Sequence, residues 1–414
     1  MLRISTAQSF DTGVERLQKR QAELADAQER LTSGKRVSKA SDDPTAAARA
    51  ERALATEARS EASQRALEAS RNAMTLTESA LADAGELMQQ AREALVAAGN
   101  GSYSDAERAA VADRLTAIRQ QLLTLANRAD GDGGYLFGGQ GGSQAPFIDG
   151  SGGVSFRGTA GEVRVASEEP LPRSIDGQAA WLASPSGNGL FETRNAAAVP
   201  NASGSWIDGG RVSDPQAFFA ATSPPAVADP AALLYRVDFT TTAAGTTFTV
   251  LKDGAATALT GVPYVSGQAI ELDGMAFTVN GSPVAGDAFE VRLATPSLGV
   301  FDTLDQAIAE LKTPLRSTAA VSQGVQRALS DLDGSMNALQ SLRSRVGEVL
   351  NRADMVEGRI AGQSLAAQTE RSNAEDLDMV KAISEFQSQQ TGYEAALKVY
   401  SSVQRMSLFQ YLNT

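Results

Sequence analysis

Proline placement divides this chain into three parts. Of its 14 prolines, one is Pro44 and the others lie between Pro146 and Pro314. Residues 45–145 and 315–414 contain none. Because proline interrupts the interior of a helix, this distribution predicts two long helical ends around a middle segment of a different kind.

The N-terminal end carries a heptad repeat, in which mostly apolar positions alternate in spacing between three and four residues. This is the spacing of a coiled-coil seam, and its members are Ala7, Phe10, Val14, Leu17, Gln21, Leu24, Gln28 and Leu31. Gly34 can take the left-handed conformation that ends a helix. Asp43 as N-cap and Pro44 at the first helical position predict a second helix that runs to about Ala98. At 1.5 Å per residue it would be roughly 80 Å long.

Further helices are predicted on both sides of the middle segment. Ser104 and Glu107 have the spacing of a capping box, which predicts a third helix. After the middle segment we expect a short helix at 304–311 and a long one whose apolar stripe spans 325–360. A polar stretch, 363–376, is expected to separate it from a final helix. That helix carries its own stripe of Met379, Ile383, Phe386, Gln390, Tyr393, Leu397, Tyr400 and Gln404.

The middle segment has the alternating pattern of β-strands. Short runs of alternating residues stand between Gly, Pro and Asn turns, at 154–157, 162–165, 235–239, 247–251, 276–279 and 289–293. The fold class is therefore predicted to be mainly α with a β-rich insert, in which both chain ends form a long antiparallel helical bundle or coiled coil.

We expect three domains that are each built from one or two stretches of sequence. Residues 1–40 with 375–414 are expected to form a terminal coiled coil. Residues 41–145 with 297–374 are expected to form a long-helix bundle, and 146–296 the β-rich insert. The N- and C-terminal ends should therefore meet although they lie far apart in sequence.

The composition excludes several functions. The chain has no cysteine and no histidine, which removes thiolate nucleophiles, Cys/His zinc sites and imidazole catalysis. No catalytic, cofactor or metal residue is assigned, and we expect a protein that is not an enzyme. The formal net charge of −12 argues against a nucleic-acid partner, because phosphate binding needs an excess of Lys and Arg.

Membrane and cleaved-signal patterns are also missing. No stretch approaches the roughly 20 apolar residues of a membrane span, so no membrane partner is expected. Residues 1–10 lack the apolar core of a cleaved secretory signal. The protein should therefore be cytoplasmic or leave the cell by a route that reads no cleaved signal.

The final helix has a wider apolar face than one partner helix can cover, because Val380, Ala396, Val399, Val403 and Leu408 lie beside its main stripe. A helix of this size gains most of its stability by packing its apolar face. We therefore predict self-assembly through an interface of Phe10, Val14, Leu17, Leu24, Leu31, Ile383, Phe386, Tyr393, Leu397, Tyr400 and Val403. A coiled coil within one molecule explains the same periodicity, and the pattern alone does not separate the two interpretations.

Both ends of the chain resemble the flagellin superfamily. The sequence RLTSGKRV at 30–37, followed by SDDPTAA at 41–47, is similar to the N-terminal signature of that superfamily, and residues 383–412 resemble its closing helix. The motif places a loop between the first two helices, and its marked residues are Gly34, Arg36, Asp42, Asp43 and Pro44. Lys35 and Arg36 are expected to contact a neighbouring subunit.

Within the superfamily, three features are most similar to the branch that joins hook and filament (the FlgL type). They are the opening LRIST at 2–6, Pro44 after the aspartate pair, and the run 125–139 that leads into the insert. The resemblance implies an extracellular structural subunit of the bacterial flagellum, exported without a cleaved signal. It also implies a self-assembling ring, neighbours of the FlgK type and flagellin, and a FlgN-type export chaperone on the C-terminal helix.

Two alternative functions are carried forward. Flagellin itself would differ by its copy number along the filament. A secreted adhesin would instead use the β insert for binding, with Trp181 and Trp206 as its candidate aromatic contacts, although core or turn packing explains both tryptophans as well.

Overall fold

The computed structural model describes residues 6–165, 169–196, 203–224, 229–243 and 245–412, without the side chains of 6–10, Ala231, Ala319 and 403–412. By compactness the chain divides into two units. The terminal unit is Met1–Arg65 with Met355–Thr414, and the central unit is Ala66–Asp354. Each unit is described by itself below.

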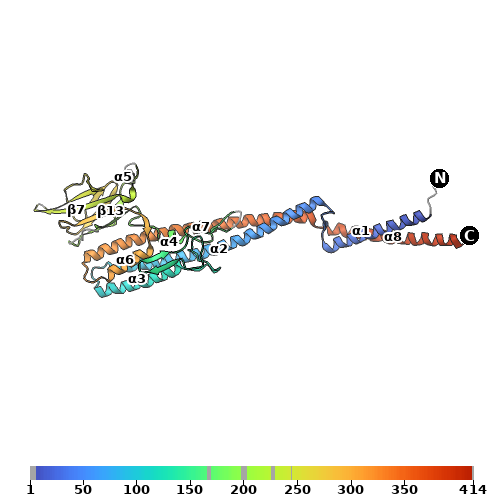
Figure 1. Cartoon of the computed structure of the whole chain (residues 1–414), viewed down its shortest axis with the longest axis horizontal. Helices are drawn as coiled ribbons and strands as arrows, with labels where there is room; N and C mark the ends of the chain where they lie inside the picture. The colour runs from blue at the N-terminus through green and yellow to red at the C-terminus, as the bar shows by residue number, and fades with distance from the viewer. Residues whose placement is uncertain (1–5, 166–168, 197–202, 225–228, 244, 413–414) are drawn as a thin grey trace. The chain divides into compact units, whose positions relative to one another are not determined.

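Helices dominate the described residues, as predicted (Figure 1). They are α1 (Thr6–Ser33), α2 (Pro44–Ala98), α3 (Asp105–Ala126), α4 (Gly177–Trp181), α5 (Pro215–Thr222), η1 (Pro230–Ala232), α6 (Val300–Lys312), α7 (Thr318–Glu375) and α8 (Met379–Leu412). The predicted limits of α2 are confirmed. So is the capping box of α3, where the Ser104 amide donates to Glu107 Oε2 over 2.7 Å. In the part of the chain that the structure describes, no helix is long and apolar enough to span a membrane.

The predicted break at 363–376 is wrong, because α7 continues through almost all of it to Glu375. The stretch is polar, but Gln, Leu, Ala, Glu and Arg are all good helix formers. Ala367 and Ala374 are buried within it, so it still presents one small apolar face. Polarity alone therefore did not end the helix.

The strands are short and antiparallel. They are β1 (Phe147–Gly150), β2 (Gly153–Phe156), β3 (Ser184–Pro185), β4 (Phe191–Asn195), β5 (Trp206–Ile207), β6 (Arg211–Val212), β7 (Leu234–Thr242), β8 (Gly245–Lys252), β9 (Ala255–Ala256), β10 (Val262–Pro263), β11 (Ala269–Leu272), β12 (Met275–Asn280), β13 (Ala288–Leu293) and β14 (Pro296–Leu298). Five of the six predicted runs form strands. The sixth run, 162–165, forms only an isolated bridge between Arg164 and Pro172, so its prediction as a strand is wrong.

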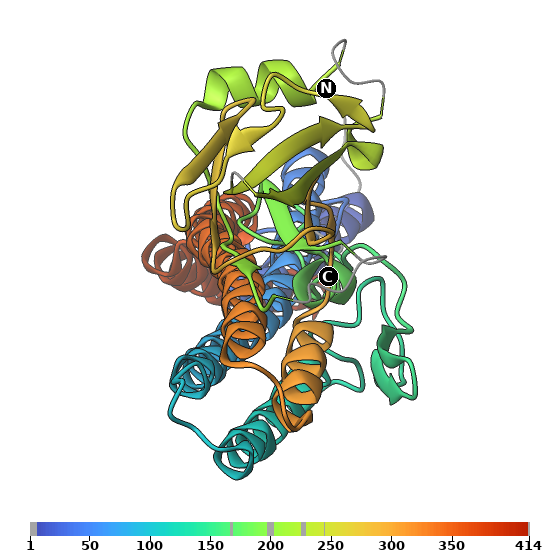
Figure 2. The ribbon, with the colours of Figure 1, turned by 90° about the vertical axis from the view of Figure 1, so that its left-hand side faces the viewer.

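The strands form one larger sheet, one smaller sheet and two two-stranded sheets (β1-β2 and β14-β3), and Figure 2 shows β7 to β13 in shades of yellow. The larger sheet has the order β10-β8-β7-β13-β4, with β9 added beside β8, and the smaller has β11-β12-β5, with β6 beside β12. Tyr235, Val237 and Phe239 alternate with less buried residues along β7, so this strand buries one face. That face belongs to a core of its own, which includes Phe191, Phe277 and Phe289.

A second core lies among the helices of the central unit. Met74, Met88, Leu115 and Leu122 are fully buried in it, and α3 packs along α6. It extends into the first part of the predicted insert, because Trp181 stacks on Phe301 with ring centroids 6.0 Å apart. The aromatic residues of 147–181 therefore pack with the helices, and Trp181 has no exposed surface.

Candidate assembly surface

The two terminal helices, α1 and α8, form an antiparallel pair within the terminal unit (Figure 1). One glycine on each helix lies at their contact. A Cβ added to Gly13 would lie 3.6 Å from Tyr400 Cδ2, and one added to Gly392 would lie 2.6 Å from Arg20 Nη1. The predicted association of the two chain ends is therefore present.

This pair buries very little. Among the described side chains of 11–33 and 379–402, none is buried. The predicted interface residues of α1 that are described, Val14, Leu17, Leu24 and Leu31, are half-buried. The side chains of Phe10 and Val403 lie outside the described residues.

The face of α8 that meets α1 differs from the predicted stripe by one residue at alternate positions. Its half-buried heptad positions are Ala382, Phe386, Gln389, Tyr393, Ala396 and Tyr400. Large apolar side chains lie beside this seam and stay in solvent: Ile383 is 45% exposed, Leu397 42%, Val399 64% and Val380 83%. Burying a side chain of this kind fully stabilises by roughly 1.5–3 kcal/mol, so the pair leaves substantial apolar surface uncovered.

The motif loop caps the two helices that it joins. Gly34 has a φ of 69°, and its amide donates to the Arg30 carbonyl over 2.9 Å, which ends α1. Asp43 Oδ1 accepts from the amides of Thr45 at 3.1 Å and Ala46 at 3.0 Å, which is the predicted N-cap of α2. The hydrogen bond from the Ala46 amide is the main reason why the pKa of Asp43 falls to about 2.

The same loop also caps the C-terminal end of α7, which is distant in sequence. The Arg36 amide donates to the Glu375 carbonyl over 2.7 Å, and Arg36 Nη2 donates to the Ala374 carbonyl over 2.7 Å. The amide of Leu377 returns a bond to the Gly34 carbonyl at 3.0 Å. Because the last carbonyls of a helix have no partner inside it, the loop completes the C-terminus of α7.

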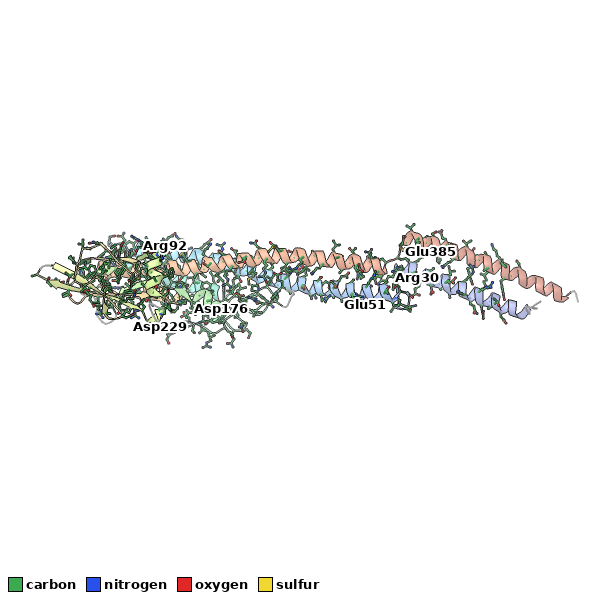
Figure 3. All side chains as sticks on the ribbon, turned by 90° about the horizontal axis from the view of Figure 1, so that it is seen from above. Arg30, Glu51, Arg92, Asp176, Asp229 and Glu385 are labelled. Atoms are coloured by element: carbon green, nitrogen blue, oxygen red, sulfur yellow. The ribbon has the colours of Figure 1, made fainter. Side chains whose placement is uncertain are left out.

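Charge reinforces this joint, by which we mean residues 34–43 together with 374–378. Lys35 Nζ lies 3.1 Å from Glu375 Oε2, and Arg36 Nη1 lies 3.2 Å from Asp43 Oδ2. Cations at a helix C-terminus also interact favourably with the helix dipole. Figure 3 labels Arg30 on α1 and Glu385 on α8, which flank the joint.

The joint gives the motif residues a role inside the chain that the sequence did not indicate. Their expected contact with a neighbouring subunit stays a prediction. Sequence reasoning missed Ala374, Glu375 and Leu377, because all three act through backbone groups and only Glu375 adds a side-chain contact, to Lys35. The one local signal was Asp378, whose Oδ1 accepts from the amides of Val380 and Lys381 at 3.1 Å and so marks the start of α8.

Known proteins resemble this chain over its whole length. Residues 4–141 match the bacterial flagellin N-terminal helical region, and residues 329–412 match the bacterial flagellin C-terminal helical region. Flagellar hook-associated protein 3 of Salmonella typhimurium is 25% identical over 413 residues, which cover 99% of this chain and 99% of that protein.

Two solved structures extend the comparison to the fold. The flagellar junction protein FlgL from Legionella pneumophila is 27% identical with a TM-score of 0.63, and the match covers 71% of this chain and 95% of that one. FlgL from Xanthomonas campestris is 25% identical with a TM-score of 0.66, and the match covers 78% of this chain and 99% of that one.

Proposed function

This chain belongs to the flagellin superfamily and is a structural subunit of the bacterial flagellum at the junction of hook and filament, and we propose that it polymerises through the apolar faces of α1 and α8. The uncovered surface of α8 carries the proposal. Every described side chain of the two paired helices remains at least partly exposed. Such helices need further neighbours, because packing supplies most of the stability of helices in proteins.

The three predicted domains supply the layers of this assembly. Residues 1–40 with 375–414 would form the inner tube, and 41–145 with 297–374 the layer around it. Residues 146–296 would face outward. The joint supports a boundary near 40 and 375, since four helix ends meet there and each has a cap from the loop or from Asp378.

The proposal includes partners at both ends of the ring. A FlgK-type hook-associated protein would lie on the hook side and flagellin on the filament side. A FlgN-type chaperone would cover the C-terminal helix before export, which would proceed without a cleaved signal to the cell exterior. Val380 and Val399, which are largely exposed, are the kind of surface that such a chaperone would shield. No catalytic activity is proposed.

Deleting the gene tests the junction role. We expect intact hooks, no filaments, and flagellin released into the medium, with filaments restored by the full-length chain. A strain that keeps normal filaments would refute the proposal. Copy number separates the alternatives, since a junction subunit should be present in few copies at one site and flagellin in thousands.

Limited proteolysis tests the assembly mechanism. In the dilute monomer, protease should trim residues 1–35 and 375–414 first, and incorporation into flagella should protect them. Ends that resist protease equally in both states would contradict the mechanism. The adhesin alternative has lost one of its two candidate contacts, because Trp181 has no exposed surface.

A further inference from the structure

The helix α7 has two different faces within the terminal unit. One face packs on α2, which runs antiparallel beside it (Figure 3). Between the two helices, Glu57 Oε2 lies 3.2 Å from Arg371 Nη1. Ala46, Ala53 and Ser60 of α2 are buried in this seam, opposite the buried residues Val356, Ile360, Ala367 and Ala374 of α7.

The other face of α7 has a second heptad stripe. Its members are Met355, Gly358, Gly362, Leu365, Thr369 and Ser372, and all six are exposed. At 3.6 residues per turn they lie roughly half a turn from the α2 seam. None is charged, although 21% of the chain is charged. Met355 is 70% exposed and Leu365 is 65% exposed, so the stripe combines exposed apolar side chains with glycine.

The two glycines have no explanation inside the molecule. An added Cβ on Gly358 or Gly362 would meet nothing within 4 Å, and neither glycine has a positive φ. Glycine in a helix interior costs about 1 kcal/mol relative to alanine. A neighbouring backbone that approaches this face closely would account for both positions.

A face of matching size lies on the opposite edge of the same helix pair. Ala48, Ala55, Ala58 and Ala62 of α2 are exposed, and they lie roughly half a turn from the α2 residues of the seam. Along the axis of the helix pair, the Glu57–Arg371 contact places this alanine face level with the C-terminal part of the α7 stripe. The large side chains of the α7 stripe can interlock with these alanines, between which Glu51 and Arg59 are also exposed.

We propose that the α7 stripe of one copy packs against the alanine face of α2 in a second copy. The proposal rests on the assembly function given above, and it adds a contact outside the α1–α8 pair. Because the two faces differ and lie on opposite edges, each copy can bind one neighbour on each side. Such heterologous contacts generate rings or helical assemblies, and this contact would add to the uncovered apolar surface of α8, which belongs to the same unit.

Cysteine cross-linking tests the contact directly, because the chain has no cysteine of its own. Leu365 and Ala62 lie on opposite edges of a two-helix layer, whose axes are about 8–10 Å apart. A disulfide needs Cβ atoms about 3.5–4.5 Å apart, so a bond between these positions can form only between copies. The full-length Leu365→Cys/Ala62→Cys chain would be assembled into flagella in the deletion strain and oxidised.

We expect a ladder of multimers on a non-reducing gel. The matched control pairs Ala62→Cys with Gln368→Cys, which is exposed but lies about a quarter of a turn off the stripe, and it should stay monomeric. If neighbouring copies are offset along the helix axis, Leu365→Cys should cross-link to Ala48→Cys, Ala55→Cys or Ala58→Cys instead. Assembled flagella in which Cys at 365 cross-links to none of the four alanine positions would overturn the inference.

A second test fills the space above the glycines. Gly358→Gln with Gly362→Gln should leave the thermal midpoint of the monomer unchanged or raised, because Gln is a better helix former than Gly. It should nevertheless lower the number of filaments at least tenfold, whereas Ala361→Gln, off the stripe, should have little effect. Normal filament numbers in the double variant would refute the inference alone. Absence of the unmodified chain from flagella would refute the proposed function as well.

Discussion

The helices of the central unit and those of the terminal unit follow the same kind of heptad pattern but reach different degrees of burial. Met74, Met88 and Leu115 of the central unit are fully buried, because α3 and α6 supply further layers of helix. Phe386 and Tyr393 of α8 occupy equivalent seam positions and remain half-buried. A heptad stripe thus predicts which face of a helix is apolar, and the number of neighbouring helices decides how much of that face is covered.

The largest difference between the units should be found in the cost of removing an aromatic ring. Phe301 is fully buried and lies between Trp181 and Phe147, so Phe301→Ala should lower the free energy of unfolding of the central unit by about 3–5 kcal/mol. Phe386→Ala should cost only about 1 kcal/mol in the monomer, because part of the side chain is already in solvent. Urea denaturation followed by circular dichroism measures both.

Equal costs for the two substitutions would remove the contrast between a closed core and an open pair. Phe386→Ala should become much more damaging in assembled flagella, where neighbours cover the helix. This makes the same variant a control for the role of assembly.

Ion pairs should show the second largest difference. The buried Arg119 guanidinium donates to Asp149 Oδ2 at 2.6 Å and to Asp305 Oδ2 at 2.8 Å, and the bonds to Asp149 are the main reason why its pKa is raised. Arg119→Ala should cost about 2–3 kcal/mol, since it leaves two carboxylates without their cation. Lys35→Ala, at the exposed joint, should cost about 0–1 kcal/mol.

The measurement is again chemical denaturation. Arg119→Lys is the control, because it keeps the positive charge but loses the planar guanidinium group that bonds both carboxylates. A result in which Lys35→Ala costs as much as Arg119→Ala would show that the joint is stronger than its exposure indicates.

Much of the helical architecture followed from local signals in the sequence. Pro44, Asp43 and Gly34 act within one or two turns of their own position, and each has the predicted place. The seam of α8 was displaced because sequence reasoning assigned the largest side chains to the contact. The seam instead includes the small residues Ala382 and Ala396, which are half-buried.

The joint could not be predicted from sequence for a different reason. Arg36 bonds to the backbone carbonyl of Ala374, 338 residues away. Any residue type presents the same carbonyl, so no side-chain pattern identifies it. The β sheets are similar: alternation predicted most strands, but their order depends on pairings between distant segments, such as β13 with β4.

Acid should change the contributions of two carboxyls, one in each unit, in opposite directions. The pKa of Asp43 in the folded chain is about 2, below its ordinary value of 3.8. Its contribution to stability is therefore present above pH 3.8 and is lost as the pH falls toward 2. Burial raises the pKa of Asp331 in the central unit, so the folded state takes up a proton first and gains stability as the pH falls through that raised pKa toward 3.8.

Carboxyl resonances in a 13C NMR titration would measure both pKa values, and amide exchange would report the stability of each unit. Asp331→Asn is the control, because the amide oxygen can still accept from the Gly187 amide, now 3.0 Å from Asp331 Oδ1, while the titration disappears. If both carboxyls titrated together near 3.8, this difference between Asp43 and Asp331 would not exist.

The smallest effect on the isolated chain is expected at Val399, whose side chain is 64% exposed. Val399→Ser removes apolar surface that no part of the described chain covers, so the stability of the monomer should change by less than about 0.5 kcal/mol. If neighbouring copies bury this face, the same substitution should reduce incorporation into flagella severalfold. Lys398→Ser, on an adjacent exposed position, controls for the loss of a long side chain. A Val399→Ser chain that incorporates as well as the unmodified chain would show that this part of α8 is not covered by assembly, and the uncovered surface would then need another partner.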